Sequence, residues 1–314
     1  MLKKLKQSQF PERNLVIILV LLIVVLSIAS NRFLSYNNIM NLLRQTSIIG
    51  VIAVGMTFVI ISAGIDLSVG SVLAFSSIIV AMLMKAGVPI PLSIIVALLA
   101  GTSLGVLMGI LIHNGSVPAF IATLGGMTMV RGAVMLISGA RKISGLPPEF
   151  KHFAVAKFLG IPGMVWVWFL VIIIGFVIAK YTIFGRNVYA IGSNEEAARL
   201  SGIKIGTNIY GIYAFCAFTS SIAGILMTTR LGNGVPTSGT GYELDVIAAV
   251  VVGGASLSGA VGSILGTVLG TIIIATIRNG GNLLGINPFI LDILVGGLIV
   301  FAVLFDQLNK KNNR

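Results

Sequence analysis

The chain has 314 residues, of which 56% are hydrophobic and only 10% are charged, and its mean hydropathy is +1.05. Soluble globular domains of this size do not have that composition. The formal net charge of +12 would suggest a nucleic-acid partner in a soluble protein, but the basic residues here lie in tails and loops between apolar runs, so no nucleic-acid partner is expected. The only cysteine, Cys216, excludes an intrachain disulfide and CxxC-type metal or redox motifs.

Long apolar runs predict an all-α, polytopic integral membrane protein that forms one transmembrane domain over residues 1–314. A bilayer core about 30 Å thick requires roughly 20 apolar residues per helical span. The lysine-rich start and the first run imitate a signal peptide, but we expect a retained span because the later segments are themselves transmembrane. About ten transmembrane helices are expected, in the segments 15–29, 46–63, 67–84, 91–113, 117–138, 164–183, 207–228, 242–252, 260–277 and 288–305.

The second and third segments form one apolar stretch that is too long for a single span. Residues 46–84 would measure about 58 Å at 1.5 Å per residue, about twice the hydrocarbon thickness. We predict a broken helix near 63–66, where Gly64 permits unusual backbone angles and Asp66 can cap the following helix.

The stretch 242–277 poses the same problem, and the glycine-rich residues 253–259 predict a second broken helix. Segment 242–252 is short for a span, so it either continues into the glycine-rich stretch or belongs to a re-entrant or broken helix. Similar sequences follow the two breaks, at 67–73 and 257–265. They indicate either an internal repeat, as in many transporters, or the small residues that packed membrane helices commonly share.

The two tails, 1–13 and 307–314, are short and basic, which favours a cytoplasmic location for both and an even number of spans. Six segments precede residues 185–206, so this stretch is also expected in the cytoplasm. The count of Lys and Arg supports this topology weakly, with 11 residues inside and 10 outside. Four of the outer ones argue against it, namely Arg141, Lys142, Lys151 and Lys157.

A compact polar segment at 192–202 interrupts the apolar sequence. Residues 195–202 mix charges with good helix formers, Asn194 or Ser193 can cap a helix there, and Gly202 can end it. This pattern is typical of a helix of about two turns at the membrane surface. An ordinary solvated loop is the alternative.

The residues Glu196-Ala197-Ala198, followed after three positions by Gly202, resemble the cytoplasmic coupling segment with which ABC importer permeases dock onto their ATPase subunit. Three further blocks resemble the ribose-type (monosaccharide) permease family: GIDLSVGS at 64–71, PAFIATL at 118–124 and GTGYELDVIAAVVVGG at 239–254. The resemblance extends from about residue 37 to 306. The longer Ile-x-Leu-Pro extension of many other ABC importers is missing, which fits the ribose type rather than the maltose type.

This resemblance implies a permease subunit, usually a homodimer, in the cytoplasmic (inner) membrane of a prokaryote. Its partners would be an ABC ATPase subunit, an extracytoplasmic sugar-binding protein, a second permease copy and membrane lipid. The chain has no GxxxxGK[ST] phosphate loop and no Gly-Lys pair, so ATP and Mg are expected in the partner ATPase, with no cofactor and no enzymatic activity in this chain. The coupling segment implied comprises Ser193, Asn194, Glu195, Glu196, Ala197, Ala198, Arg199 and Gly202.

A polar sugar requires a path whose groups replace the hydrogen bonds of water. The candidates for this path, or for a gate in it, are Asp66, Ser68, Ser71, Thr123, Ser256, Ser258, Asn279 and Asn282. Alternatively, Ser and Thr bond to their own backbone or to neighbouring helices.

Residues 230–245 are expected on the extracytoplasmic side of the membrane. They either form a gate or a binding-protein contact, for which the candidates are Thr240, Tyr242, Glu243 and Asp245, or form an ordinary turn whose two acids favour a helix N-terminus.

An ion-gradient-driven secondary transporter of a small polar solute is the main alternative function, and a membrane scaffold or channel is a more distant one. A secondary transporter usually needs a carboxylate or histidine near the bilayer midplane. None of the nine acids is placed near the midplane by these segments. Asp292, in the last span, comes nearest to such a position, and its alternative interpretation is a residue at an interface or at a helix start. His113 and His152 are far apart without Cys or acidic neighbours, so no metal site is expected.

Overall fold

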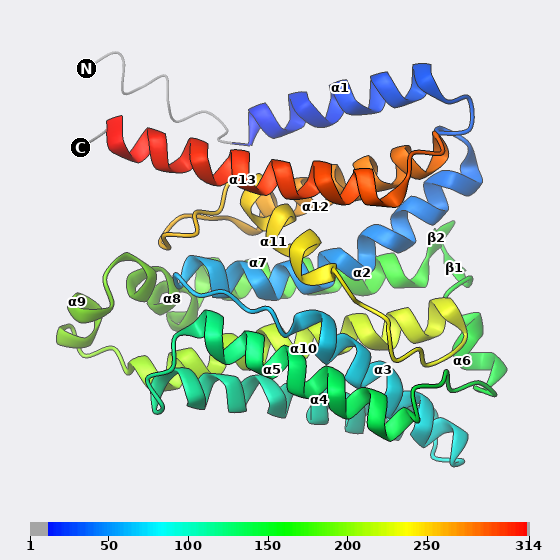
Figure 1. Ribbon diagram of the computed structural model, residues 1–314, viewed down its shortest axis with the longest axis horizontal. Coiled ribbons are helices and arrows are strands. Elements are labelled where there is room, and N and C mark those ends of the chain that lie inside the picture. The colour runs from blue at the N-terminus through cyan, green and yellow to red at the C-terminus, as the bar shows by residue number, and fades with distance from the viewer. Residues whose placement is uncertain (1–11, 313–314) are drawn as a thin grey trace.

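The computed structural model describes residues 12–312, and helices form nearly all of its regular secondary structure in that range (Figure 1). Two two-residue strands form a small antiparallel hairpin, in which Lys157 pairs with Pro162 and Phe158 with Ile161. The elements are α1 (Arg13–Ala29), α2 (Tyr36–Ile61), α3 (Val69–Lys85), α4 (Ile90–His113), α5 (Ala119–Ser138), α6 (Pro148–His152), β1 (Lys157–Phe158), β2 (Ile161–Pro162), α7 (Gly163–Tyr181), α8 (Ile183–Ser193), α9 (Glu195–Leu200), α10 (Ile205–Leu231), α11 (Tyr242–Val252), α12 (Ile264–Leu283) and α13 (Pro288–Asn312).

Within residues 12–312, six helices are long and apolar enough to cross a membrane: α2, α4, α5, α7, α10 and α12. Three others are apolar but shorter, namely α1, α3 and the part Pro288–Leu304 of α13. Helix α11 has 11 residues and would rise only about 16 Å. The predicted all-α membrane class is therefore confirmed, whereas the lengths of the described helices support six long spans and do not confirm about ten.

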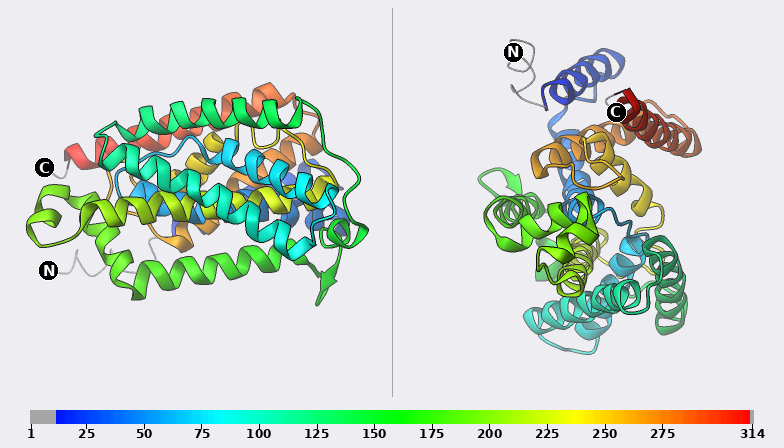
Figure 2. Two further views of the ribbon diagram at one scale, coloured as in Figure 1. Left: turned by 90° about the horizontal axis from the view of Figure 1, so that it is seen from below. Right: turned by 90° about the vertical axis from the view of Figure 1, so that its left-hand side faces the viewer.

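The core lies along α2 and α10, which are buried over most of their length. Helices α3, α4 and α5 pack on one side of this centre, and α1, α12 and α13 lie on the opposite side (Figures 1 and 2). Small residues allow the closest approach, since a Cβ added at Gly105 of α4 would overlap the carbonyl oxygen of Tyr213 in α10, and one at Gly109 would lie 2.9 Å from the Cα of Tyr210.

The molecule is elongated, and its two ends differ. Helices α8 and α9 lie at one end, which we call the α9 end; α13 ends on that side, and α1 runs from near the middle of the molecule away from it (Figure 1). The opposite end carries α6 and the β1–β2 hairpin, and we call it the hairpin end. Trp166 at the start of α7 donates its indole N–H to the Phe158 carbonyl at 3.1 Å, which ties this hairpin to the helices.

The first predicted break is confirmed, because residues 62–68 between α2 and α3 are not helical. The residue with the left-handed backbone is Ala63 (φ +62°), however, so the prediction of unusual angles at Gly64 was wrong. Gly64 instead permits close packing, since a Cβ there would lie 2.6 Å from the Tyr213 hydroxyl. Asp66 is not the N-cap of α3 either. The N-cap is Ser68, and the Asp66 carboxylate accepts bonds from the Ser68 backbone N–H (2.8 Å) and hydroxyl (2.6 Å).

The second predicted break is also confirmed and covers residues 253–263, between α11 and α12. Gly254, Gly259, Ala260 and Gly262 all have positive φ there, so the chain reverses tightly. Ser263 then caps α12 by accepting the Gly266 N–H at 2.9 Å. Of the two similar sequences, 67–73 lies mostly in α3 and 257–265 lies mostly within the second break, and the internal repeat stays a prediction.

Candidate functional site

The coupling segment predicted from the sequence folds as two short helices, α8 and α9. Asn194 ends α8, and its side chain caps α9 by accepting the Ala197 N–H at 2.9 Å, whereas Ser193 does not cap. Gly202 (φ +85°) closes α9, since its N–H bonds to the Arg199 carbonyl and the next N–H bonds to the Ala198 carbonyl. Helix α9 has six residues, which is close to the length of about two turns that the sequence predicts, whereas the sequence did not reveal α8.

Helix α9 presents an exposed face at its end of the molecule. Of the predicted coupling residues, Ser193, Asn194, Glu195, Glu196, Ala197, Arg199 and Gly202 are exposed. Ala198 is buried and anchors α9 in the main apolar core, while Leu200, not predicted as functional, is 79% exposed.

Glu196 and Arg199 form an ion pair at 2.6 Å on the exposed face of α9. The hydrogen bond to Glu196 and its negative charge raise the pKa of Arg199, which stays cationic. An exposed pair contributes little to stability. The face therefore offers a solvated pair of opposite charges beside an exposed leucine, a combination suited to a protein partner.

Two non-helical stretches enter the core from opposite ends of the molecule. Residues 62–68 run inward from the α9 end, and residues 232–241 run inward from the hairpin end (Figure 1). They meet where α3 begins, because a Cβ added at Gly70 would overlap the Gly239 carbonyl oxygen and lie 2.5 Å from Glu243 Oε2. Non-helical backbone at membrane depth occurs where it is buried in protein or lines a cavity, and broken helices carry substrate sites in many transporters.

Four of the eight predicted path residues gather beside this meeting point. Asp66, Ser68, Ser71 and Thr123 are each at most 2% exposed. The Ser71 hydroxyl donates to the Ser68 carbonyl (2.8 Å), and Thr123 Oγ1 lies 2.8 Å from the Ala119 carbonyl of its own helix and 3.3 Å from the Ile65 carbonyl. The alternative of bonding to nearby backbone thus holds for Ser71 and Thr123 in this conformation. The cluster is polar, compact and closed.

The carboxyl of Asp66 is buried, whereas the sequence placed Asp66 only close to a predicted break and no acid at the bilayer midplane. Asp66 is 1% exposed, and Tyr213 and Cys216 of α10 lie beside it. Among the described residues, no Lys, Arg or His nitrogen lies within 4.0 Å of it. A buried acid without a cation is costly inside a membrane protein, so Asp66 stays a candidate for the path or its gate.

The other four predicted path residues lie elsewhere. Ser256 and Ser258 belong to the second break, where Ser258 is exposed and its hydroxyl accepts from Gln307 at 3.3 Å. The side-chain amides of Asn279 and Asn38 donate a hydrogen bond to each other, both at 2.9 Å, so Asn279 joins α12 to α2. Asn282 is exposed near the end of α12. The structure therefore does not bring the eight residues into one path.

The four residues predicted to contact the binding protein also differ in exposure. Thr240 is exposed, and Tyr242 and Glu243 are partly exposed. Asp245 is 3% exposed and accepts two bonds from Arg278 of α12, one of them from Nε at 2.9 Å; it lies in the first turn of α11, as the alternative of an acid at a helix N-terminus expects. Arg278 also pairs with Asp292 of α13 at 3.0 Å, which gives Asp292 a structural partner.

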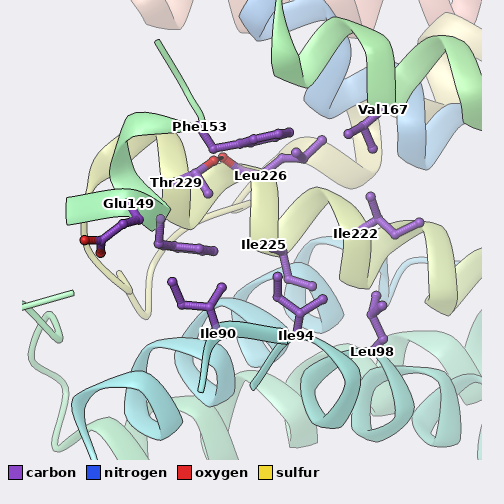
Figure 3. Close-up of a pocket in the computed structure, with 11 residues that line it drawn as sticks. Ile90, Ile94, Leu98, Glu149, Phe153, Val167, Ile222, Ile225, Leu226 and Thr229 are labelled. Carbon is purple, nitrogen blue, oxygen red and sulfur yellow. Dashed lines mark hydrogen bonds between the residues drawn. The ribbon is translucent and has the colours of Figure 1, made fainter. Parts of the chain in front are cut away.

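A cavity of about 350 Å³ lies between α4, α6, α7 and α10 (Figure 3). None of the predicted path residues lines it. Its walls are aliphatic and aromatic apart from Glu149 and Thr229, and such a lining does not offer the hydrogen bonds that a sugar requires. The lining residues are Ile90, Ile94, Leu98, Glu149, Phe150, Phe153, Val167, Ile222, Ile225, Leu226 and Thr229.

An all-α membrane protein with non-helical stretches that meet in its core, and with a capped polar helix exposed at one end, has the architecture of a transporter permease. The chain belongs to the family described as "Branched-chain amino acid transport system / permease component", whose profile matches residues 38–303.

Relatives cover nearly the whole chain. It is 44% identical to the ribose import permease protein RbsC of Haemophilus influenzae over 94% of this chain and 93% of the relative, and 46% identical to RbsC of Bacillus subtilis over 92% and 90%. The D-allose transport system permease protein AlsC of Escherichia coli is 37% identical over 91% and 88%. No solved structure matches the chain. The predicted membership of the ribose-type permease family is thus confirmed.

Proposed function

We propose that this chain is the membrane permease subunit of an ABC importer that carries a monosaccharide into a prokaryotic cell. Full-length similarity to permeases named for ribose carries the proposal, since three such relatives are 40–46% identical over more than 90% of this chain. The relatives named for D-allose and xylose are 37% and 35% identical. Ribose is therefore the first sugar to test, although the family description names amino acids.

We further propose that the ten apolar segments cross or enter the inner membrane with both tails in the cytoplasm. Helix α1 runs toward the hairpin end and α13 runs back toward the α9 end, which supports an even number of crossings (Figure 1). Residues 1–11 and 313–314 of the two basic tails lie outside the described residues. In this topology, the α9 end is cytoplasmic and the hairpin end is extracytoplasmic.

The ATPase subunit, which would bind ATP and Mg, docks on α9 in this proposal. The exposed Glu196–Arg199 pair and Leu200 offer charge and apolar surface to a groove on that partner, and the sequence lacks a phosphate loop of its own. Movement of the ATPase would enter the permease there. A second permease copy and lipid would cover the exposed apolar sides of helices such as α4 and α7.

The sugar-binding protein docks on the hairpin end in this proposal. Four basic residues are exposed there, Arg141, Lys142, Lys151 and Lys157, and they match a partner with an acidic surface. Such a partner would also explain why Lys and Arg are only slightly more numerous on the cytoplasmic side. Ile143 beside them exchanges two backbone hydrogen bonds with Gly234, at 2.8 and 2.9 Å. Docking on this loop would therefore act on residues 232–241, which lead to the central meeting point.

Reversing the charges on α9 tests the proposal. Glu196→Arg with Arg199→Glu should abolish uptake of labelled ribose in vesicles that contain the chain, its ATPase subunit and its binding protein, because the docking surface is inverted while membrane insertion is retained. Glu196→Asp with Arg199→Lys is the matched control and should transport normally. Unchanged uptake by the reversed variant would show that α9 is not the docking site.

The buried Asp66 gives the ion-gradient-driven carrier its best support. The same vesicles separate the two functions when the chain is reconstituted alone. A proton or sodium gradient should then drive no uptake, and uptake should require ATP and both partners. Gradient-driven uptake by the isolated chain would establish the carrier and overturn the importer.

A further inference from the structure

Three segments that are far apart in the sequence meet at the α9 end: the end of α2, the second break and the end of α8. The Ala260 N–H donates to the Ile61 carbonyl at 2.8 Å, which joins the two breaks directly. Gly192 of α8 packs on this bond, because an added Cβ would overlap the Ile61 carbonyl oxygen and lie 2.9 Å from the Ala260 nitrogen. The three backbones touch with no side chain between them.

The same place holds two strained residues. Ala63 (φ +62°) follows α2, and Ala260 (φ +61°) lies in the second break. A Cβ added at Gly259 would overlap the Gly192 carbonyl oxygen and lie 2.9 Å from the Ala63 Cβ, so these residues pack against one another. Alanine keeps a left-handed backbone only where its surroundings impose it, and such strain concentrates at switch regions.

A side chain provides the second link between α8 and the second break. Tyr189 lies one turn before Gly192 in α8, and its hydroxyl donates to the Gly262 carbonyl at 2.9 Å. Partial burial raises the pKa of Tyr189, so the hydroxyl keeps its proton and remains a donor. Gly192 and Tyr189 therefore hold the loop 253–263 at two points, three residues apart on the same helix.

We propose that this contact, the α8 joint formed by Ile61, Ala63, Tyr189, Gly192 and residues 259–262, passes the movement of α8 and α9 to both broken helices at once. From Ile61, the chain leads within seven residues to Ser68 and the central polar cluster. From Ala260, it leads back to α11 and forward to α12. Tyr189 and Gly192 are thus positioning residues for transport, and neither has to touch the sugar.

This inference rests on the proposed coupling role of α9. The quantity to measure is the coupling ratio, the number of ribose molecules carried per ATP hydrolysed. Tyr189→Phe removes one hydroxyl without a change of shape. In the reconstituted importer it should lower the number of ribose molecules carried per ATP about two- to tenfold, as expected for one hydrogen bond, while ATP hydrolysis continues. Tyr181→Phe, at the exposed end of α7, is the matched control and should leave the ratio unchanged.

Gly192→Ala tests the backbone contact separately. It should abolish transport while the ATPase subunit still binds and hydrolyses ATP, because the added Cβ separates Ile61 from Ala260. Gly132→Ala in α5, where an added Cβ meets nothing within 4 Å, is its control. If Gly192→Ala does not insert, the Tyr189→Phe ratio decides alone.

The outcomes separate the joint from the proposed function. An unchanged ratio in Tyr189→Phe, or a parallel loss of hydrolysis and transport with a lower melting temperature, would reduce the joint to ordinary packing. If the charge reversal on α9 disrupts transport but Tyr189→Phe does not alter the ratio, only the joint fails. If the charge reversal has no effect, the proposed docking on α9 fails first.

Discussion

The two breaks in the helices differ in burial and in what holds them. Residues 62–68 follow a long buried helix and carry Asp66 and Ser68 into the core, where side chains satisfy the polar groups. Residues 253–263 follow the short α11 and form a partly exposed turn rich in positive φ. The comparison indicates different tasks: the first break presents polar groups inside the protein, and the second links α11 and α12 to α8.

The same difference explains how each break is stabilised. The first depends on short hydrogen bonds within the segment and on close packing at Gly70 and Gly239. The second is flanked by helices that an ion pair joins, since Asp245 of α11 bonds to Arg278 of α12. Substitutions at these positions should therefore affect the two breaks differently.

The largest effect is expected from removal of the ion pair that joins the helices on either side of the second break, at the ends of α11 and α12 that lie away from the break. Asp245→Ala leaves Arg278 half-buried with only the exposed Asp292, and breaking a buried pair costs about 3–5 kcal/mol. The melting temperature of the purified protein in detergent should fall strongly. Asp292→Ala, whose side chain is 60% exposed, is the control and should cost about 0–1 kcal/mol. Equal losses would mean that Asp245 is not the main support.

A smaller effect is expected where the first break meets residues 232–241. Gly70→Ala places a Cβ against the Gly239 carbonyl, and overpacking of this kind costs about 1–3 kcal/mol. Uptake should fall along with the melting temperature, because the two stretches can no longer approach. Gly125→Ala, where an added Cβ meets nothing, should be neutral or stabilise by up to about 1 kcal/mol. A Gly70→Ala variant with normal uptake would exclude a tight central contact during transport.

Element positions could be predicted because helix length and bilayer thickness obey simple geometry, and both breaks were located in this way. The caps of α9 were also readable, since Asn194 and Gly202 act within a few residues of their partners. Contacts between residues that are far apart in the sequence could not be predicted. Local sequence does not show that Gly192 lies against Ile61 and Ala260, or that Asn279 forms a hydrogen bond with Asn38.

The smallest effect is expected at Thr123 of α5, which faces the first break. Thr123→Val keeps the shape and removes a hydroxyl whose shorter bond stays within its own helix, while the contact to the Ile65 carbonyl is 3.3 Å long. Hydrogen bonds between membrane helices are worth about 0.6 kcal/mol on average, so the melting temperature should hardly change. The KM for ribose uptake is the informative readout. If this hydroxyl lines the path when the central cluster opens, KM rises while stability is kept, whereas Ser258→Ala at the exposed second break leaves both unchanged. A large drop in melting temperature for Thr123→Val would instead show that α5 holds the first break in place, and that Thr123 is structural.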